Sequence, residues 1–257
     1  MRIGFIGTGG ISEAIIRGMI GCANHVDPIF VSTRSASRSS RLEADFQNVA
    51  AFDHNQEIVD RSDWLVLAVL PGQAEKVISE LKFSSTHTVI SLVAGLEYQT
   101  LVNDLAPCVD ICRMIPLPPI EFGVGPLPIY PAHGAITDFF SKLGTVIPVD
   151  QESWFTLFSA NSALMANFFE WIAWQSRWMQ EQGMPQSEAA QYACSFATGL
   201  ATLAARCNAE QLEGLSQECL TSGGLNEHVL NESLAMEWFE RLRLPLDQVL
   251  ARLTTKS

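Results

Sequence analysis

Short, continuous apolar runs alternate with segments of helical spacing through the first part of the chain. The apolar runs are bounded by turn-forming or polar residues and predict strands, at residues 2–7, 28–34, 49–52, 63–71, 88–95 and 110–119. The segments between them predict helices, at residues 11–20, 37–46, 55–62, 72–82 and 97–105. Apolar strands that alternate with helices are typical of a parallel sheet covered on both faces. We therefore expect an α/β fold with a Rossmann-type, doubly wound parallel sheet.

The pattern changes near Val149–Asp150, and no later segment has the character of a strand. Runs of helical spacing follow, at residues 153–181, 186–207, 209–219, 227–243 and 245–254. The sequence therefore predicts two domains, a nucleotide-binding α/β domain over residues 1–150 and an all-helical domain over residues 151–257.

One predicted helix carries a long apolar face. Trp171, Trp174 and Trp178 are spaced three and four residues apart, and Leu164 and Phe168 extend the same face. Such a face is most often the core of its own domain. It can also be a contact between subunits, because about 100 helical residues supply little cover for it. The sequence leaves both interpretations open.

Composition and charge exclude several functional classes. The 257 residues carry a net charge of −12 without a basic stripe, so binding to nucleic-acid phosphates is not expected. The apolar segment 157–179 contains Asn161, Asn167, Glu170 and Arg177, which argues against a membrane span. The amino-terminal strand breaks at glycine, unlike the apolar region of a secretion signal. We expect a cytoplasmic protein.

The six cysteines are scattered and include no CxxC motif. Cys108 and Cys112 are four positions apart, but no second pair of cysteines or histidines completes a metal site. We therefore expect reduced thiols in the core, and no metal.

A glycine-rich loop follows the first predicted strand and opens the first helix. Gly7 allows a tight turn, Gly9 lets backbone approach a pyrophosphate, and the small residues Ser12 and Ala14 let the helix lie close to the strand. The N–H groups at the helix start then face the anion. This order favours dinucleotide binding, and the alternative is an ordinary strand-to-helix turn.

The residues after the second predicted strand indicate which dinucleotide binds. A site for NAD has a carboxylate there, which accepts a hydrogen bond from the ribose 2′-hydroxyl. This chain instead has hydroxyl and guanidinium groups, on Ser32, Thr33, Arg34, Ser35 and Arg38. Such groups suit a 2′-phosphate, so the sequence favours NADP(H). The alternative is that both arginines are solvated loop charges.

Several segments, in order along nearly the whole chain, resemble the pyrroline-5-carboxylate reductase family. They are residues 3–19, 31–35, 68–73, 91–96, 113–119, 143–163 and 220–228, together with Asn55. The resemblance implies an NADP-binding Rossmann domain and a helical domain that forms a dimer, often assembled further. Motif and resemblance together predict cofactor-binding residues at Gly7, Thr8, Gly9, Gly10, Ile11, Ser32, Arg34, Ser35, Asn55, Ala68, Val69, Leu70, Pro71, Ala94 and Gly95.

The segment "LTSGGLNEH", residues 220–228, resembles the family's substrate loop. The resemblance implies that it binds the substrate carboxylate, with Thr221 and Ser222 as catalytic candidates and Gly223, Gly224 and Asn226 as substrate-binding candidates. Exposed N–H groups at a helix start agree with an anion site. Without the resemblance, a glycine connector between two helices is the alternative.

The chain departs from the family's pattern where cofactor and substrate are expected to meet. Leu70 replaces a lysine and Leu117 replaces an asparagine. Residues 161–163 replace a stretch rich in serine, glycine and proline, and Leu225 and Asn226 replace a pair of threonines. The fold can therefore be shared while the substrate differs.

The reaction implied by the resemblance is hydride transfer from NADPH to a protonated cyclic imine carboxylate, which gives proline. Positioning supplies most of the acceleration in such a reaction. The proton donor stays open: Thr221 or Ser222 orients it, or a water does, and His228 is the nearest titratable candidate unless it is a solvated histidine at a helix start. Glu170, on the apolar helix, is either functional or a structural carboxylate with a partner. Two alternatives remain: an oxidoreductase acting on another small imine or carbonyl acid, and a non-catalytic NADP-binding sensor or scaffold dimer.

Overall fold

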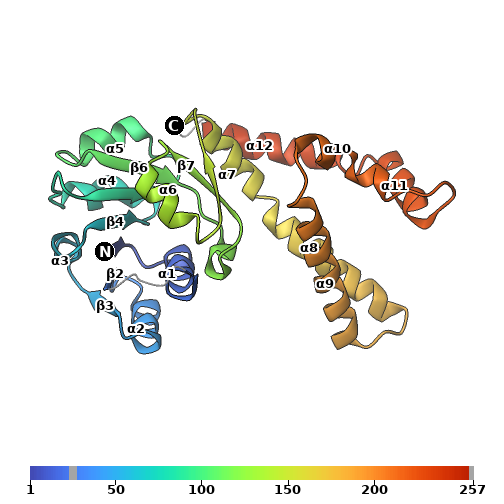
Figure 1. Ribbon diagram of the computed structural model, residues 1–257, viewed down its shortest axis with the longest axis horizontal. Helices are drawn as coiled ribbons and strands as arrows, with labels where there is room; N and C mark the ends of the chain where they lie inside the picture. The colour runs from blue at the N-terminus through green and yellow to red at the C-terminus, as the bar shows by residue number, and fades with distance from the viewer. Residues whose placement is uncertain (23–27, 255–257) are drawn as a thin grey trace. The chain divides into compact units, whose positions relative to one another are not determined.

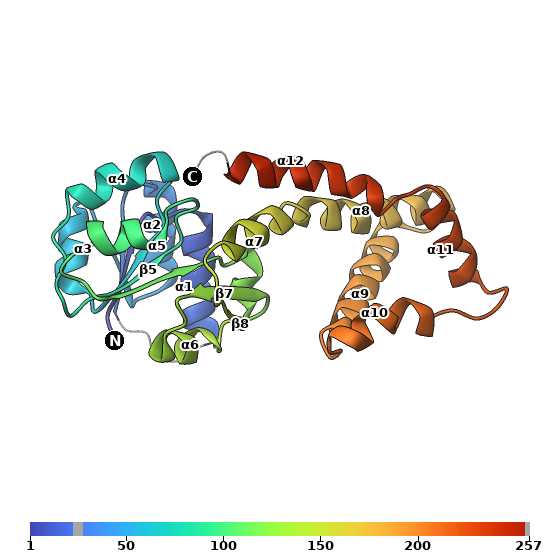
Figure 2. The same cartoon turned by 90° about the horizontal axis from the view of Figure 1, so that it is seen from above.

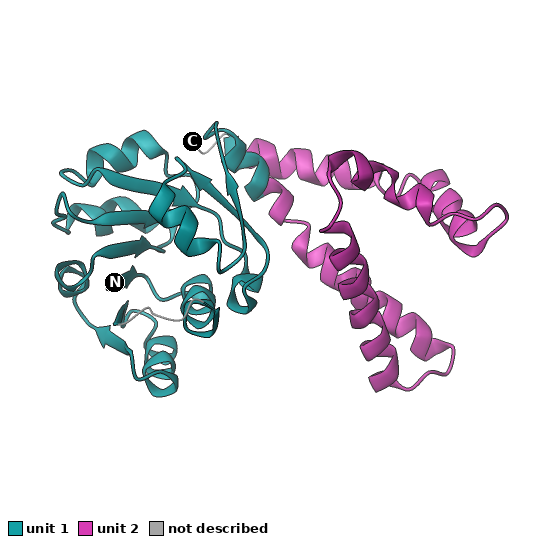
Figure 3. Cartoon of the chain, in the orientation of Figure 1, with its two compact units in different colours: residues 1–159, 253–257 teal, residues 160–252 magenta. Residues whose placement is uncertain are grey.

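The computed structural model describes residues 1–22 and 28–254, which form two compact units (Figures 1 and 3). The first unit comprises Met1–Ser159 and Leu253–Ser257, as far as these residues are described, and the second comprises Ala160–Arg252. The first is an α/β unit, and the described residues of the second form helices and their connections.

The first unit is built on one eight-stranded sheet, with strands β1 (Ile3–Ile6), β2 (Ile29–Ser32), β3 (Val49–Phe52), β4 (Trp64–Leu67), β5 (Thr88–Ser91), β6 (Asp110–Met114), β7 (Pro126–Tyr130) and β8 (Thr145–Pro148). Their order in the sheet is β3-β2-β1-β4-β5-β6-β7-β8. Neighbouring strands are parallel except for β6 and β7, which are antiparallel. The strand order reverses between β1 and β4, and open α/β sheets bind ligands at the carboxyl ends of the strands at such a point.

Helices cover both faces of this sheet: α1 (Gly10–Cys22), α2 (Ala36–Asp45), α3 (Asn55–Arg61), α4 (Pro71–Ser79), α5 (Tyr98–Asp104) and α6 (Gly134–Phe140), with a 3-10 helix η1 (Pro118–Phe122). Buried residues of α1, α2, η1 and α6 form one apolar cluster, and those of α3, α4 and α5 form another. Within β1, Ile3 and Phe5 belong to the first cluster and Ile6 to the second. The strands lack polar alternation because both of their faces are buried.

The doubly wound parallel sheet predicted from the sequence is confirmed, and β7, α6 and β8 are additions to it. The sequence of β7 is Pro-Leu-Pro-Ile-Tyr. Proline donates no hydrogen bond to a sheet, so this segment does not resemble a strand. The last predicted strand, 110–119, is shorter than expected, because β6 ends at Met114 and η1 begins at Pro118.

The remaining helices are α7 (Trp154–Ser162), α8 (Met165–Glu181), α9 (Gln186–Ala204), α10 (Ala209–Glu218), α11 (Leu225–Ala235) and α12 (Arg243–Thr254), with a 3-10 helix η2 (Glu240–Leu242). The single helix predicted over 153–181 is interrupted between Ser162 and Met165. Helices α8 and α9 lie side by side as a hairpin (Figures 1 and 2).

The helical unit buries few apolar side chains. Its buried apolar residues, among those described, are all alanines: Ala160, Ala189, Ala193 and Ala197. Trp174 and Trp178 are 54% and 53% exposed. The interpretation of the tryptophan face as the core of its own domain is therefore wrong for these two residues.

The cysteines agree only in part with the expectation of core thiols. All six are free, which is consistent with reduced thiols. Cys108 and Cys112 are buried, whereas Cys22, Cys194 and Cys219 are exposed. The expectation of a core position is therefore wrong for these last three.

Candidate functional site

The glycine loop between β1 and α1 has the geometry of a phosphate cradle. Gly7 has a φ of +102°, and a Cβ there would lie 2.5 Å from the carbonyl oxygen of Ala68. Only glycine fits such a position without strain. A Cβ on Gly9 or Gly10, by contrast, would meet no protein atom within 4 Å. The backbone is therefore accessible at these two positions, beside the N-terminal turn of α1.

Hydrogen bonds hold the loop against the end of β2. The N–H of Gly7 donates to Ser32 Oγ over 3.0 Å, and Thr8 Oγ1 donates to the Ser32 carbonyl oxygen over 2.7 Å. Ser12 Oγ donates to the Gly7 carbonyl oxygen over 2.7 Å. Thr8, Ser12 and Ser32 are buried. Of the predicted cofactor residues, Thr8 and Ser32 therefore shape the loop through their side chains.

The segment after β2 contains the groups predicted to hold a 2′-phosphate. Arg34 is exposed, and its side chain makes no hydrogen bond or ion pair within the described ranges. Arg38 instead pairs with Glu13 of α1 over 3.4 Å. The same Glu13 carboxylate also pairs with Arg17 and Arg41. Arg34 is thus the guanidinium group available to a ligand, with the half-buried Ser35 beside it.

The other predicted cofactor residues follow β4 and β5 or begin α3. Ala68 and Val69 are half-buried after β4, Leu70 is the exposed N-cap of α4, and Pro71 is its first residue. Asn55 is the first residue of α3. Ala94 and Gly95 are exposed after β5, and Gly95 has a φ of +75°. The residues after β1, β2, β4 and β5 all lie at the carboxyl edge of the sheet, because these strands are parallel.

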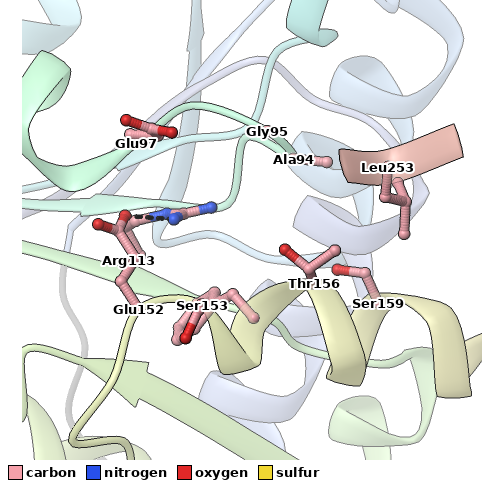
Figure 4. Close-up of a pocket in the computed structure, with 10 residues that line it drawn as sticks. Ala94, Gly95, Glu97, Arg113, Glu152, Ser153, Thr156, Ser159 and Leu253 are labelled. Atoms are coloured by element: carbon pink, nitrogen blue, oxygen red, sulfur yellow. Dashed lines mark hydrogen bonds and ion pairs between the residues drawn. The ribbon is translucent and has the colours of Figure 1, made fainter. Parts of the chain in front are cut away.

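Two adjoining cavities of about 270 and 300 Å³ lie at this edge and share Ala94, Arg113, Phe155 and Ser159. Ile11, at the start of α1, lines the second. Figure 4 shows Glu97, Arg113 and Glu152 at one end of the first cavity and Thr156, Ser159 and Leu253 at the other. The cavities therefore combine predicted cofactor residues with a charged pair that the sequence did not reveal.

Arg113 and Glu152 form a partly buried ion pair. The guanidinium group of Arg113 lies 4.8 Å from the centre of the Phe155 ring. The Tyr98 N–H donates to Glu152 Oε1 over 2.6 Å. Arg113 is a buried charge that follows the apolar pair Ile111–Cys112 in β6, and a buried charge needs a partner. That signal could have drawn attention to Arg113, but not to which residue pairs with it.

Burial raises the pKa of two groups near this ion pair. Burial, followed by the neighbouring Tyr130, raises the pKa of the Tyr98 hydroxyl. Burial also raises the pKa of the Cys112 thiol to about 12. Both groups are therefore protonated near neutral pH, and a thiolate nucleophile at Cys112 is excluded.

The predicted substrate loop, residues 220–228, comprises most of the connection from α10 to α11 and the first turn of α11 in the helical unit. Thr221 and Ser222 are exposed, and Gly224 is the N-cap of α11. The N–H of Gly223 donates to Glu227 Oε2 over 2.7 Å. Asn226 Nδ2 donates to the Cys219 carbonyl oxygen over 3.0 Å. Two groups predicted to bind substrate thus already have hydrogen-bond partners, one within the loop and one at the residue before it.

The remaining titratable candidates are exposed. His228 lies in the first turn of α11, where its N–H donates to the Gly224 carbonyl oxygen over 3.1 Å. Glu170 pairs with Arg177 on the surface of α8.

Within residues 1–22 and 28–254, no cluster of histidine, cysteine, aspartate and glutamate could hold a metal ion. None of the described helices is long and apolar enough to span a membrane.

Known proteins resemble this chain along most of its length. Residues 2–95 match the family described as "NADP oxidoreductase coenzyme F420-dependent". Pyrroline-5-carboxylate reductase of Vibrio alginolyticus is 25% identical over 252 residues, 91% of this chain and 92% of that protein. The reductase of Escherichia coli (strain K12) is 32% identical over 134 residues, 51% of this chain and 49% of that protein.

A solved structure shares the fold. Plasmodium falciparum pyrroline carboxylate reductase with NADP bound matches with a TM-score of 0.84 at 17% identity, over 100% of this chain and 98% of that chain. The Rossmann-type sheet and the helical C-terminal part are thus confirmed together. The chain is an NADP-dependent oxidoreductase by its similarity to these proteins, and over most of its length it is similar to pyrroline-5-carboxylate reductases.

Proposed function

We propose that this protein is an NADPH-dependent reductase that transfers hydride to a cyclic imine carboxylate. The first candidate substrate is pyrroline-5-carboxylate, and its product is proline. The observation that carries the proposal is the cradle formed by Gly7, Gly9 and Gly10 at the start of α1, which has open space at the second and third glycines. The names of relatives that cover most of the chain support the substrate.

Different residues of the α/β unit would bind different groups of the cofactor. The N–H groups beside Gly9 and Gly10 would hold the pyrophosphate, and Arg34 with Ser35 would hold the 2′-phosphate. Ala94 and Gly95 line the cavity that would receive the nicotinamide end. When bound, NADPH supplies the hydride, and the chain's own residues bind, orient and exclude water.

The substrate needs little covalent help. A protonated imine carries its own positive charge, so hydride addition to carbon leaves a neutral amine and requires no nucleophile from the protein. We assign carboxylate binding to the loop that contains Thr221, Ser222, Gly223, Gly224 and Asn226. The hydroxyl groups of Thr221 and Ser222 orient the substrate, or they orient a water that accepts a hydrogen bond from its protonated nitrogen.

We also propose that the protein is cytoplasmic and forms a homodimer or a larger homo-oligomer through its helical unit. The exposed side chains of Phe168, Trp174 and Trp178 support this, because such side chains are rarely left in water as a group.

A second candidate function keeps the cofactor but changes the substrate. The exposed Leu70 and the half-buried Leu117 favour it, since both replace polar residues of the family's pattern.

The experiment that tests the proposal is the consumption of NADPH by the purified protein with pyrroline-5-carboxylate. We expect turnover by the wild type, and loss of it in Gly9→Ala, whose Cβ would fill the cradle. Gly21→Ala is the matched control, because Gly21 lies in α1, the helix that begins directly after Gly9, and also has open space around its Cβ position.

Three outcomes separate the candidates. Turnover of pyrroline-5-carboxylate supports the first function. Turnover only of other cyclic imines or carbonyl acids supports the second. NADPH binding without turnover of any of them would leave a sensor or scaffold as the function, and the proposal would be wrong.

A further inference from the structure

The carboxylate of Asp53, the residue after β3, lies beside the segment predicted to bind the 2′-phosphate. Strands β2 and β3 pair in parallel with Ser32 opposite Phe52, so Thr33 and Asp53 leave the sheet side by side. The N–H of Thr33 donates to the Phe52 carbonyl oxygen over 3.1 Å. Thr33 Oγ1 donates to Asp53 Oδ1 over 2.6 Å. Backbone register and side-chain contact thus agree on the position of Asp53.

The hydroxyl groups at the end of β2 are largely engaged. Ser32 is buried and bonded to the glycine loop, and Thr33 is bonded to Asp53. Arg38 pairs with Glu13. A 2′-phosphate would therefore find one free guanidinium group, on Arg34, with the Asp53 carboxylate beside the preceding residue.

The charge of Asp53 is not neutralised by a neighbour. Asp53 is exposed, and it forms no ion pair in the part of the chain that the structure describes. The guanidinium group of Arg61, in the helix after Asp53, lies 4.9 Å from the centre of the Phe52 ring and does not pair with Asp53. A like charge at short range disfavours a bound phosphate, and the repulsion weakens with salt.

We propose that Asp53 is a specificity-determining residue that narrows the preference for NADP(H) over NAD(H). Asp53 follows β3, and its carboxylate lies beside Thr33, the residue after β2, which is where sites for NAD place the acid that accepts a hydrogen bond from the ribose 2′-hydroxyl. It accepts that hydrogen bond from NAD(H) and repels the 2′-phosphate of NADP(H), which Arg34 attracts. The inference rests on the proposed use of a nicotinamide dinucleotide.

The opposed charges predict opposite effects of two substitutions. Asp53→Asn removes the repulsion and should widen the ratio of NADP⁺ to NAD⁺ affinity about fivefold. Arg34→Ala should weaken NADP⁺ binding about tenfold and NAD⁺ binding little. Thr33→Val keeps the carboxylate charge and should change the ratio less than Asp53→Asn does.

The experiment measures the dissociation constants of NADP⁺ and NAD⁺ by calorimetry for the wild type and these variants, at low and high salt. Oxidised cofactors require no turnover, so the result does not depend on the substrate. Asp104→Asn is the matched control, because Asp104 is an exposed aspartate at the end of α5, at the opposite edge of the sheet.

We expect the wild type to bind NADP⁺ less than about tenfold more tightly than NAD⁺, and Asp53→Asn to raise that ratio most at low salt. An affinity ratio in Asp53→Asn equal to that in Asp104→Asn would overturn the inference and leave the proposed function standing. Failure of the wild type to bind either dinucleotide would overturn both.

Discussion

The two units of this chain use apolar residues in different ways. The α/β unit buries large side chains in two clusters, one on each face of its sheet. In the helical unit, the buried apolar residues among those described are alanines, while Phe168, Trp174, Trp178 and Leu203 are exposed. A unit that leaves large apolar side chains in water gains little stability from them. The comparison teaches that the α/β unit buries its own core, whereas the helical unit leaves its large apolar side chains exposed.

The largest expected effect tests whether the α/β unit is stabilised by its own core. Phe5 is fully buried in β1, and Phe122 of the same unit is 74% exposed. Phe5→Ala should lower the free energy of unfolding by about 4 kcal/mol, through lost burial and the cavity left behind. Phe122→Ala should lower it by less than about 0.5 kcal/mol. Denaturant titration measures both, and equal losses would contradict the assignment of the core.

The second prediction separates folding from binding within the glycine loop. Gly7→Ala places a Cβ 2.5 Å from the Ala68 carbonyl oxygen at a φ of +102°, and should destabilise the α/β unit by about 3 kcal/mol. Gly9→Ala meets no protein atom within 4 Å, so it should leave the melting temperature unchanged while NADP⁺ affinity falls. Thermal melts and calorimetry distinguish the two. A Gly7→Ala variant with wild-type stability and wild-type NADP⁺ affinity would contradict the left-handed conformation of Gly7 and its close approach to Ala68.

The α/β unit could be predicted largely because its strands are continuous apolar runs. The glycine loop could be predicted too, because strand, glycine and helix are contiguous. Asp53 and the pair of Arg113 with Glu152 could not, since sheet register or the fold brings them to their partners. The strand β7 could not be predicted either, because its two prolines are untypical of a strand. The apolar pattern of α8 could not distinguish a core from an interface, because both produce the same spacing.

The third prediction tests what covers the helical unit. Trp178→Glu should weaken self-association at least about 30-fold, because buried tryptophans dominate the energy of protein interfaces. Phe122→Glu, in the α/β unit, is the control for adding a charge at an exposed aromatic position. Sedimentation equilibrium measures both. If Trp178→Glu keeps the assembly of the wild type, the helical unit is covered by something other than a second copy through this face.

The smallest expected effect concerns an ion pair that joins two strand starts of the α/β unit. Arg2 precedes β1 and Asp63 precedes β4, and the Arg2 N–H donates to Asp63 Oδ2 over 2.9 Å while its guanidinium Nη2 lies 2.6 Å from Oδ1. The side-chain hydrogen bond from Arg2 lowers the pKa of Asp63 from 3.8 to about 2. Since the folded-state pKa is lowered, the pair stabilises the fold above pH 4, and this contribution is lost as pH falls towards 2.

Asp63→Asn should therefore flatten the loss of stability between pH 4 and pH 2, by a small amount because the pair is exposed. Arg2→Gln should flatten the same window in part, since it removes the guanidinium group but leaves the backbone N–H that also lowers the pKa of Asp63. Denaturant titrations across this window measure the two slopes, and the double variant should match Asp63→Asn alone. If the double variant flattens the window further than each single one, Arg2 and Asp63 act separately, and the acid sensitivity of this edge comes from other carboxylates. An exposed ion pair of this kind adds a small contribution to the stability of a unit that already has a buried apolar core. It could not replace the buried apolar area that the helical unit lacks.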